Sequence, residues 1–134
     1  MKKITSEWLK SASYDLLLIE EIKFKETLTH IAAFHAQQAI EKSLKAILEE
    51  KGVEIPKIHK LKTLFAITGM SFENDNEELM VKMLDSLYIE ARYPGDMGLL
   101  PEGKPSVDDI LKFYEFAQSI MNRVKGVDRI KKTP

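Results

Sequence analysis

Apolar residues recur every three or four positions along most of the chain, and this spacing predicts helices with one apolar face each. The predicted helices cover about residues 6–24, 27–51, 60–68, 77–91 and 106–124. No stretch of convincing length alternates apolar and polar residues as a half-buried strand would. The sequence therefore predicts an all-α fold, an antiparallel bundle of four long helices plus a short one.

Residues that commonly begin and end helices set the boundaries. N-caps are expected at Ser6 for the first helix, at Thr27 or Thr29 for the second, and at Ser106 with Asp109 for the last. Gly52 and Gly69 should end the second and third helices, because glycine adopts the left-handed conformation at little cost. Pro94 disfavours helical angles in its predecessor, so the fourth helix should end near Arg92. The stretch 93–105 holds three prolines and three glycines and is predicted to be a surface loop.

Composition narrows the class of protein. The 134 residues fit one domain, 1–134, with a basic tail from about residue 127 that is expected to fray. Lys and Arg number 20 against 21 Asp and Glu, so the formal net charge is -1 and any phosphate-binding surface must be local. The absence of cysteine excludes disulfides, a thiol nucleophile and a cysteine zinc site. No signal peptide or membrane-spanning run is apparent, and we expect a cytoplasmic protein that does not contact membranes.

The predicted helix 27–51 has two distinct faces. Its apolar face consists of Ala33, Ala36, Ile40, Leu44, Ile47 and Leu48. Its opposite face gathers His35, Gln38, Glu41, Lys42 and Lys45 beside Ile31 and Phe34. Three interpretations stay open. The face is solvated and held by local pairs such as Glu41 with Lys45, or it contacts another helix or a partner through Ile31 and Phe34. In the third, Lys42 and Lys45 bind a phosphate or RNA.

Four segments follow one another in an order and spacing that point to one protein family. Trp8, Ala12, Asp15 and Leu16 are followed by FHAQQAIEKSLKAIL from Phe34, IHKLKTL around His59 and EARYPG from Glu90. From about residue 8 to 124 the chain resembles the HEPN domain family, named for a higher-eukaryote and prokaryote nucleotide-binding domain. The resemblance implies a helical bundle, frequent dimerisation, and partnership with small nucleotidyltransferases of the minimal type.

The resemblance also implies what a catalytic member needs. Ribonuclease members carry an Arg followed within a few residues by a His, and the pair activates the attacking 2′-hydroxyl and stabilises charge on the phosphate. Here Arg92 stands at the matching place, but no histidine follows His59, so the general base is missing. Asp96 lies at a similar offset, but a carboxylate repels the phosphate. Arg92 is predicted either to bind a phosphate or to pair with Glu90 or Asp96 and hold the loop.

The histidines and aromatic residues have simpler expected roles. His30 and His35 are five positions apart and so do not share a helical face, and no metal site is predicted. His59 precedes the short helix and is expected to cap it or to bond a backbone carbonyl. Core positions rather than base-stacking positions are predicted for the large aromatic residues Trp8, Phe113, Tyr114 and Phe116.

The predicted function is a HEPN-like, non-catalytic interaction module without a cofactor. We expect a homodimer that binds a minimal nucleotidyltransferase, a nucleotide or an RNA phosphate. The candidate phosphate-binding residues are Arg92, Lys42, Lys45, Gln38 and His35, and the candidate interface residues are Ile31 and Phe34. The alternative is a metal-independent, RNA-cleaving subunit like the toxin of a toxin–antitoxin pair, in which Arg92 acts with a histidine from elsewhere, such as His35 or His59.

Overall fold

A computed structural model of the chain describes the backbone of residues 1–92 and 104–132 and the side chains of residues 1–89 and 104–126. Its elements are α1 (Lys3–Ile22), a 3-10 turn η1 (Glu26–Leu28), α2 (Thr29–Glu50), α3 (Leu61–Thr68), α4 (Asp75–Arg92) and α5 (Val107–Lys132). No strand occurs in these residues, and the predicted all-α bundle of four long helices and a short one is confirmed. Within the described ranges no helix combines the length and apolar character needed to cross a bilayer.

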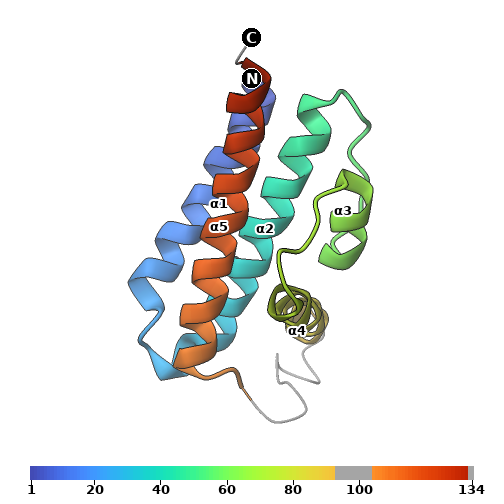
Figure 1. Ribbon diagram of the computed structural model, residues 1–134. Helices are drawn as coiled ribbons and strands as arrows, with labels where there is room; N and C mark the ends of the chain where they lie inside the picture. Colours follow the sequence, from blue (N-terminus) through green and yellow to red (C-terminus); the bar gives the residue numbers. More distant parts are fainter. Residues whose placement is uncertain (93–103, 133–134) are drawn as a thin grey trace.

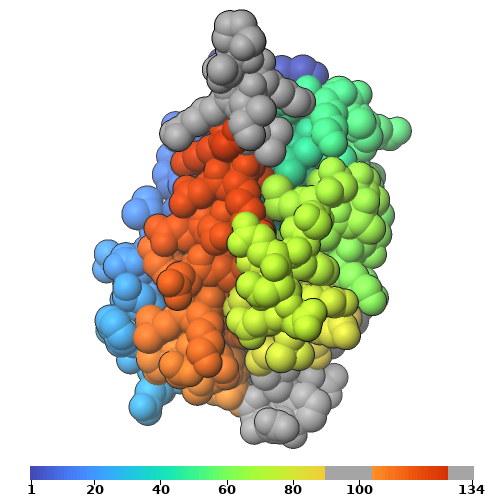
Figure 2. All heavy atoms as spheres, viewed as in Figure 1, coloured from blue at the N-terminus to red at the C-terminus, as the bar shows by residue number. Residues whose placement is uncertain are grey.

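Helix α2 lies at the centre of the molecule. Figure 1 shows α1, α2 and α5 running lengthwise beside one another, with α4 seen close to end-on and α3 next to it. α2 packs against all four of the other helices. Figure 2 shows α5 and the segment at the start of α4 meeting on the front face. Arg123 of α5 bonds Glu77 of α4. Because neighbours surround it, α2 keeps only a narrow row of partly exposed residues.

The apolar core is built largely on α2. The face predicted from the sequence is buried at every position, namely Ala33, Ala36, Ile40, Leu44, Ile47 and Leu48. Leu9, Ala12, Leu16 and Ile19 of α1 meet it. Phe113 and Phe116 of α5 are buried, as predicted. Trp8 and Tyr114 pack against the edge of the core and stay partly exposed.

Several helix ends follow the local signals in the sequence. The N–H of Ser106 donates to the Asp109 carboxylate at 3.0 Å, and the N–H of Asp109 donates to the Ser106 hydroxyl at 3.0 Å, so the two residues form the predicted capping box. Gly52 and Gly69 have φ of 72° and 77°, the left-handed values expected where helices stop. The described part of α4 runs to Arg92, and most of the predicted loop at 93–105 lies outside the described residues.

Two predicted N-caps are wrong. α1 begins at Lys3, and Ser6 lies within its first turn rather than at its cap. The reason is tertiary, because the backbone N–H of Lys2 and the hydroxyl of Thr5 both donate to Glu50 at the end of α2. Thr29 is the first residue of α2, and its hydroxyl donates back to the carbonyl of Glu26 in η1 instead of capping the helix.

The C-terminal helix is longer than its apolar stripe indicated. α5 continues to Lys132, within the basic tail for which fraying was expected. The fraying itself stays a prediction.

Candidate functional site

The partly exposed row of α2 lies between α1 on one side and α3 and α4 on the other. It consists of Ile31, Phe34, His35, Gln38 and Lys42, and His30, Glu49 and Glu50 are also partly exposed near the two ends of the helix. Side chains from the neighbouring elements form hydrogen bonds with members of this row or stack on them. The row therefore contacts other helices of the same chain, as one of the three interpretations expected, and its binding to a partner, a phosphate or RNA stays a prediction.

Asp15 of α1 forms hydrogen bonds with two residues of the row. Its carboxylate is buried, with Oδ1 2.8 Å from Nδ1 of His35 and Oδ2 2.8 Å from Nζ of Lys42. An ionised carboxylate only accepts, so His35 donates through Nδ1, and its Nε2 takes no part in this bond. The side chains of His35 and Lys42 are 26% and 23% exposed. Asp15 thus holds two N–H donors side by side at the surface.

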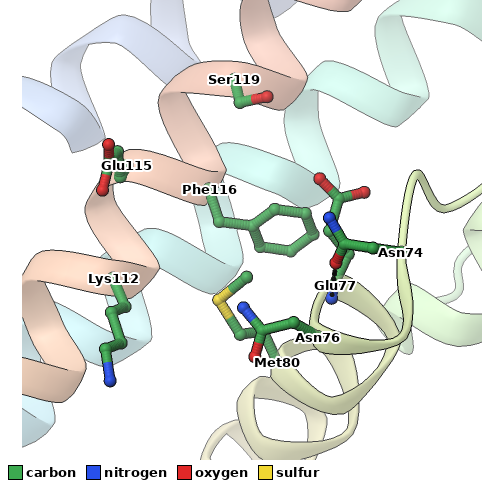
Figure 3. Close-up of a pocket in the computed structure, with 8 residues that line it drawn as sticks. All are labelled: Asn74, Asn76, Glu77, Met80, Lys112, Glu115, Phe116 and Ser119. Atoms are coloured by element: carbon green, nitrogen blue, oxygen red, sulfur yellow. Dashed lines mark hydrogen bonds between the residues drawn. The ribbon is translucent and has the colours of Figure 1, made fainter.

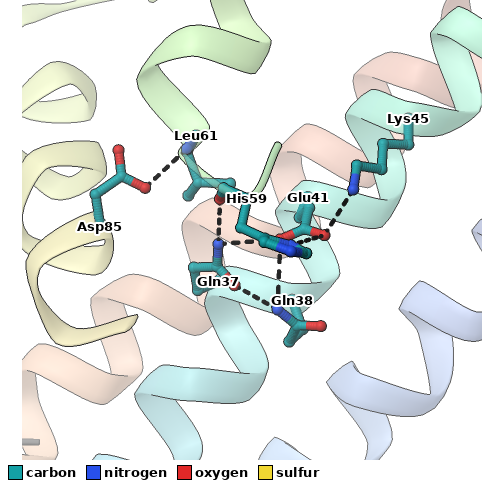
Figure 4. Close-up of polar contacts among 7 residues, drawn as sticks. All are labelled: Gln37, Gln38, Glu41, Lys45, His59, Leu61 and Asp85. Carbon is teal, nitrogen blue, oxygen red and sulfur yellow. Dashed lines mark hydrogen bonds and ion pairs between the residues drawn. The ribbon is translucent and has the colours of Figure 1, made fainter. Parts of the chain in front are cut away.

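Glu41 organises a second cluster, drawn in Figure 4. Its buried carboxylate accepts from Nζ of Lys45 at 3.0 Å, from Nδ1 of His59 at 3.1 Å and from Nε2 of Gln37 at 3.3 Å. Gln37 also donates to the backbone carbonyl of His59 at 2.8 Å. The predicted pair of Glu41 with Lys45 is present, but each side chain is only 7% exposed, so the pair is buried rather than solvated.

The role expected for His59 is wrong. Its ring nitrogen bonds the Glu41 carboxylate, and it does not cap α3. The cap comes instead from Asp85 of α4, whose carboxylate accepts from the N–H groups of Leu61 at 2.7 Å and Lys62 at 3.1 Å. Asp85 thus satisfies these N–H groups, and the imidazole of His59 lies against Glu41 of α2 (Figure 4).

Four rings form a row beside the two clusters. Phe34 stacks on Tyr88 of α4 with centroids 5.8 Å apart and planes 8° apart. Tyr88 in turn meets the ring of His59 at 5.5 Å, and His35 meets Phe34 edge-on at 5.5 Å. The side chain of His59 is 43% exposed. Rings and N–H donors therefore occupy one surface, a combination that suits a nucleotide with a phosphate and a flat base.

Among the candidate phosphate-binding residues whose side chains are described, three are partly exposed and one is buried. His35, Gln38 and Lys42 share the row, whereas Lys45 is buried against Glu41. The amide of Gln38 donates to the side chain of Gln37 at 2.7 Å. Contacts of these residues with a ligand stay predictions.

Arg92 is the last residue of α4, four positions after Tyr88, and its side chain, like those of Glu90 and Asp96, lies outside the described residues. Ile31 is 37% exposed, but the ring of Phe34 is engaged by Tyr88. An interface between chains at Ile31 and Phe34 stays a prediction.

Sequence reasoning missed Tyr88, Asp85 and Gln37. Tyr88 carried one usable signal, because residues four apart share a helical face and it stands four positions before Arg92. Nothing in the local sequence pointed to Asp85 or Gln37, because each forms a hydrogen bond with a residue more than 20 positions away in the chain.

A separate hollow of about 240 Å³ lies between the start of α4 and α5, as Figure 3 shows. It is lined by Asn74, Asn76, Glu77, Met80, Lys112, Glu115, Phe116 and Ser119. The carboxylate of Glu77 is already bonded to Arg123 and to the N–H of Glu73. Because the hollow is small for a ligand site and this carboxylate is satisfied, we assign it no ligand.

The fold and sequence match known proteins over almost the whole chain. The family model for the HEPN domain matches residues 5–127. The crystal structure of ST0689, an archaeal HEPN homologue, is 28% identical, with a TM-score of 0.68 over 94% of this chain and 98% of that one. TT1696 from Thermus thermophilus shares the fold at 24% identity, with a TM-score of 0.71 over 93% and 98% of the two chains. A search of curated proteins gave no match. The extent of the family match, together with the fold, establishes that this chain belongs to the HEPN domain family.

Proposed function

We propose that this HEPN domain is a non-catalytic binding module that holds the phosphate group of a nucleotide or of RNA. One observation carries the proposal: the buried carboxylate of Asp15 holds His35 and Lys42 side by side as partly exposed N–H donors. Donors that are fixed before the ligand arrives lose little side-chain entropy on binding. The family resemblance also favours a minimal nucleotidyltransferase as the protein partner.

The proposed site recognises phosphate through hydrogen bonds more than through net charge. Asp15 offsets the charge of Lys42, in agreement with a whole chain whose formal net charge is -1. Gln38 adds an amide on the same row, and Arg92 is proposed to complete the phosphate contacts from the end of α4. Lys45 has a supporting role, because its ammonium group keeps the Glu41 carboxylate bonded inside the protein.

Titration with a labelled single-stranded RNA and with a mononucleotide tests the proposal. Lys42→Gln and His35→Gln should each weaken binding by about tenfold, the usual scale for losing one charge-assisted hydrogen bond. Glutamine can still donate to Asp15, so thermal unfolding should change little. Added salt should also weaken the binding of the wild-type protein.

The matched control is Lys112→Gln on α5. Lys112 is exposed, and its ammonium group pairs with Asp108 at 3.1 Å, away from the proposed site. Equal affinities for Lys42→Gln, His35→Gln and this control would show that the row of α2 is not the binding surface.

An RNA-cleaving site is the second candidate, because Glu41 orients the imidazole of His59. Nδ1 of His59 is bonded to the carboxylate, and the side chain is 43% exposed. A carboxylate that orients an imidazole in this way is common in general-base sites. We rank binding first because the family motif lacks its histidine after Arg92.

A further inference from the structure

The bond between Asp15 and His35 determines which nitrogen of the imidazole is left for a ligand. Nδ1 of His35 lies 2.8 Å from Oδ1 of the buried Asp15 carboxylate, and it carries the proton because an ionised carboxylate only accepts. A neutral imidazole has one N–H group, and here Asp15 accepts it. Nε2 of the neutral ring is therefore an acceptor, which repels phosphate oxygens. Nε2 becomes a donor only when the ring takes up a second proton.

The charges around the imidazole lead to the same requirement. The ammonium group of Lys42 lies 2.8 Å from the other oxygen of Asp15, so these two opposite charges offset each other. With a neutral His35, the three side chains carry no net charge. With a protonated His35, they carry one positive charge, which attracts an anion. The proton on His35 thus supplies both the second hydrogen bond and the net charge of the site.

Two residues of α4 face the same surface. Tyr88 stacks on Phe34, and the Phe34 ring stands perpendicular to the imidazole of His35. Arg92, four positions after Tyr88, stays charged because arginine does not lose its proton in proteins. Histidine is the side chain whose charge ordinarily changes between about pH 5 and pH 8. His35 is therefore the group expected to set the pH dependence of this site.

The second histidine of this surface has a similar bond but a different neighbour. Nδ1 of His59 bonds the Glu41 carboxylate at 3.1 Å, and Nζ of Lys45 bonds the same carboxylate. The side chain of Lys45 is 7% exposed, whereas that of Lys42 is 23% exposed. Of the two clusters, that of Asp15 is therefore the one that offers an imidazole and an ammonium group together to one phosphate.

We propose that a proton regulates the phosphate site, because the imidazole of His35 donates to a phosphate oxygen through Nε2 only in its protonated form. This inference rests on the proposed phosphate-binding function and adds the condition under which the site is filled. Asp15 is then a positioning residue, since it occupies Nδ1 and leaves Nε2 for the ligand. Phosphate affinity should fall as the pH rises, because the ring loses the proton that binding requires.

Fluorescence anisotropy with an oligouridylate that carries a pH-insensitive dye tests the proposal at about pH 5.5 and about pH 8, at constant ionic strength. The phosphodiesters and bases of this probe keep their charge over this range, unlike a terminal phosphate, whose second pKa is about 6. The wild-type protein should bind about tenfold more weakly at the higher pH, the scale of one charge-assisted hydrogen bond. His35→Gln should lose most of this difference. His59→Gln should retain it, and Lys112→Gln should match the wild type at both pH values.

Nitrogen NMR of the histidine rings follows the proton directly, with His35→Gln to assign the signals. In the free protein at about pH 8, Nδ1 of His35 should carry the proton and Nε2 should not. At about pH 7, adding the RNA should raise the protonated fraction of His35. Asp15→Asn should reduce the pH dependence of binding, because an asparagine amide can donate to Nδ1 and leave the proton of a neutral ring on Nε2. Circular dichroism should show equal helix content in all variants.

The opposing results separate this inference from the proposed function. Equal RNA affinity at the two pH values, together with weaker binding by Lys42→Gln, would overturn the proton requirement and leave the phosphate site standing. A neutral His35 that carries its proton on Nε2 in the free protein would also overturn it. So would a pH dependence that His59→Gln removes and His35→Gln retains, which would place the proton on the cluster of Glu41. A wild-type protein that binds no RNA at either pH would overturn the proposed function, and this inference with it.

Discussion

At the scale of single residues, Asp85 shows how a distant carboxylate replaces a local helix cap. α3 has no side-chain cap of its own, and its first N–H groups, on Leu61 and Lys62, donate to Asp85 of α4. Burial raises the pKa of Asp85, although these two hydrogen bonds and the positive charge of Lys60 act in the opposite direction. The buried carboxylate of Asp85 therefore needs these two N–H groups as hydrogen-bond donors, and the start of α3 needs the carboxylate as their acceptor.

Asp85→Ala should lower the free energy of unfolding by about 1–3 kcal/mol, because it leaves two backbone N–H groups without an acceptor. Asp85→Asn should cost less, since the amide oxygen still accepts one hydrogen bond and no buried charge has to be desolvated. Urea unfolding followed by circular dichroism measures both changes. Equal losses for the two variants would mean that the carboxylate charge, and not the acceptor, stabilises the start of α3.

At the scale of elements, Arg123 joins α5 to the start of α4 through ion pairs. Arg123 donates to both carboxylate oxygens of Glu77, and it also contacts Glu73. Burial alone would raise the pKa of Glu77, but the bond to Arg123, the N–H of Glu73 and the charge of Arg123 together lower it. The lowered pKa of Glu77 determines whether the folded protein gains or loses stability as the pH falls. A carboxyl with a lowered pKa in the folded state stabilises the protein above its unfolded-state pKa, and this stabilisation is lost as the pH falls through the lowered value.

Glu77→Gln should therefore destabilise the protein most near neutral pH. The difference from wild type should shrink as the pH falls through the lowered pKa of Glu77, because the carboxylate then becomes protonated and loses its charged bond to Arg123. Urea unfolding at a series of pH values gives this comparison, with Glu115→Gln, an exposed residue of α5, as the control. A difference that stays constant from pH 7 to about pH 3 would show that the pairing with Arg123 is not the source of the stability.

At the scale of the whole molecule, the bundle gathers polar groups that are far apart in the chain. Asp15 comes from α1, the row of donors from α2, His59 from the segment before α3, and Tyr88 from α4. The central position of α2 explains this, because every other helix packs against it. The same surface therefore serves the proposed phosphate site and supplies the histidine of the RNA-cleaving alternative.

The purified protein should show no metal-independent cleavage of single-stranded RNA above background. Wild type, Arg92→Ala and His59→Ala should give equal background rates, because the family motif has no histidine after Arg92 to act as general base. Gel analysis of end-labelled RNA provides the measurement. Cleavage by the wild type that both substitutions abolish would favour the nuclease and contradict the binding module.

The sequence alone determined the features that depend on neighbours within a few residues. The helical period, the apolar face of α2, the capping box of Ser106 with Asp109 and the left-handed stops at Gly52 and Gly69 all belong to this group. These features follow from local backbone and side-chain preferences, and the family resemblance followed from segments in their order along the chain.

Only the tertiary structure decided which polar groups pair. Asp15 and Lys42 are 27 residues apart, Glu41 and His59 are 18 apart, and Leu61 and Asp85 are 24 apart. No local rule selects such pairs, because packing of the helices determines which carboxylate lies beside which donor. Packing likewise buried Glu41 with Lys45, although their spacing alone was equally compatible with a solvated pair.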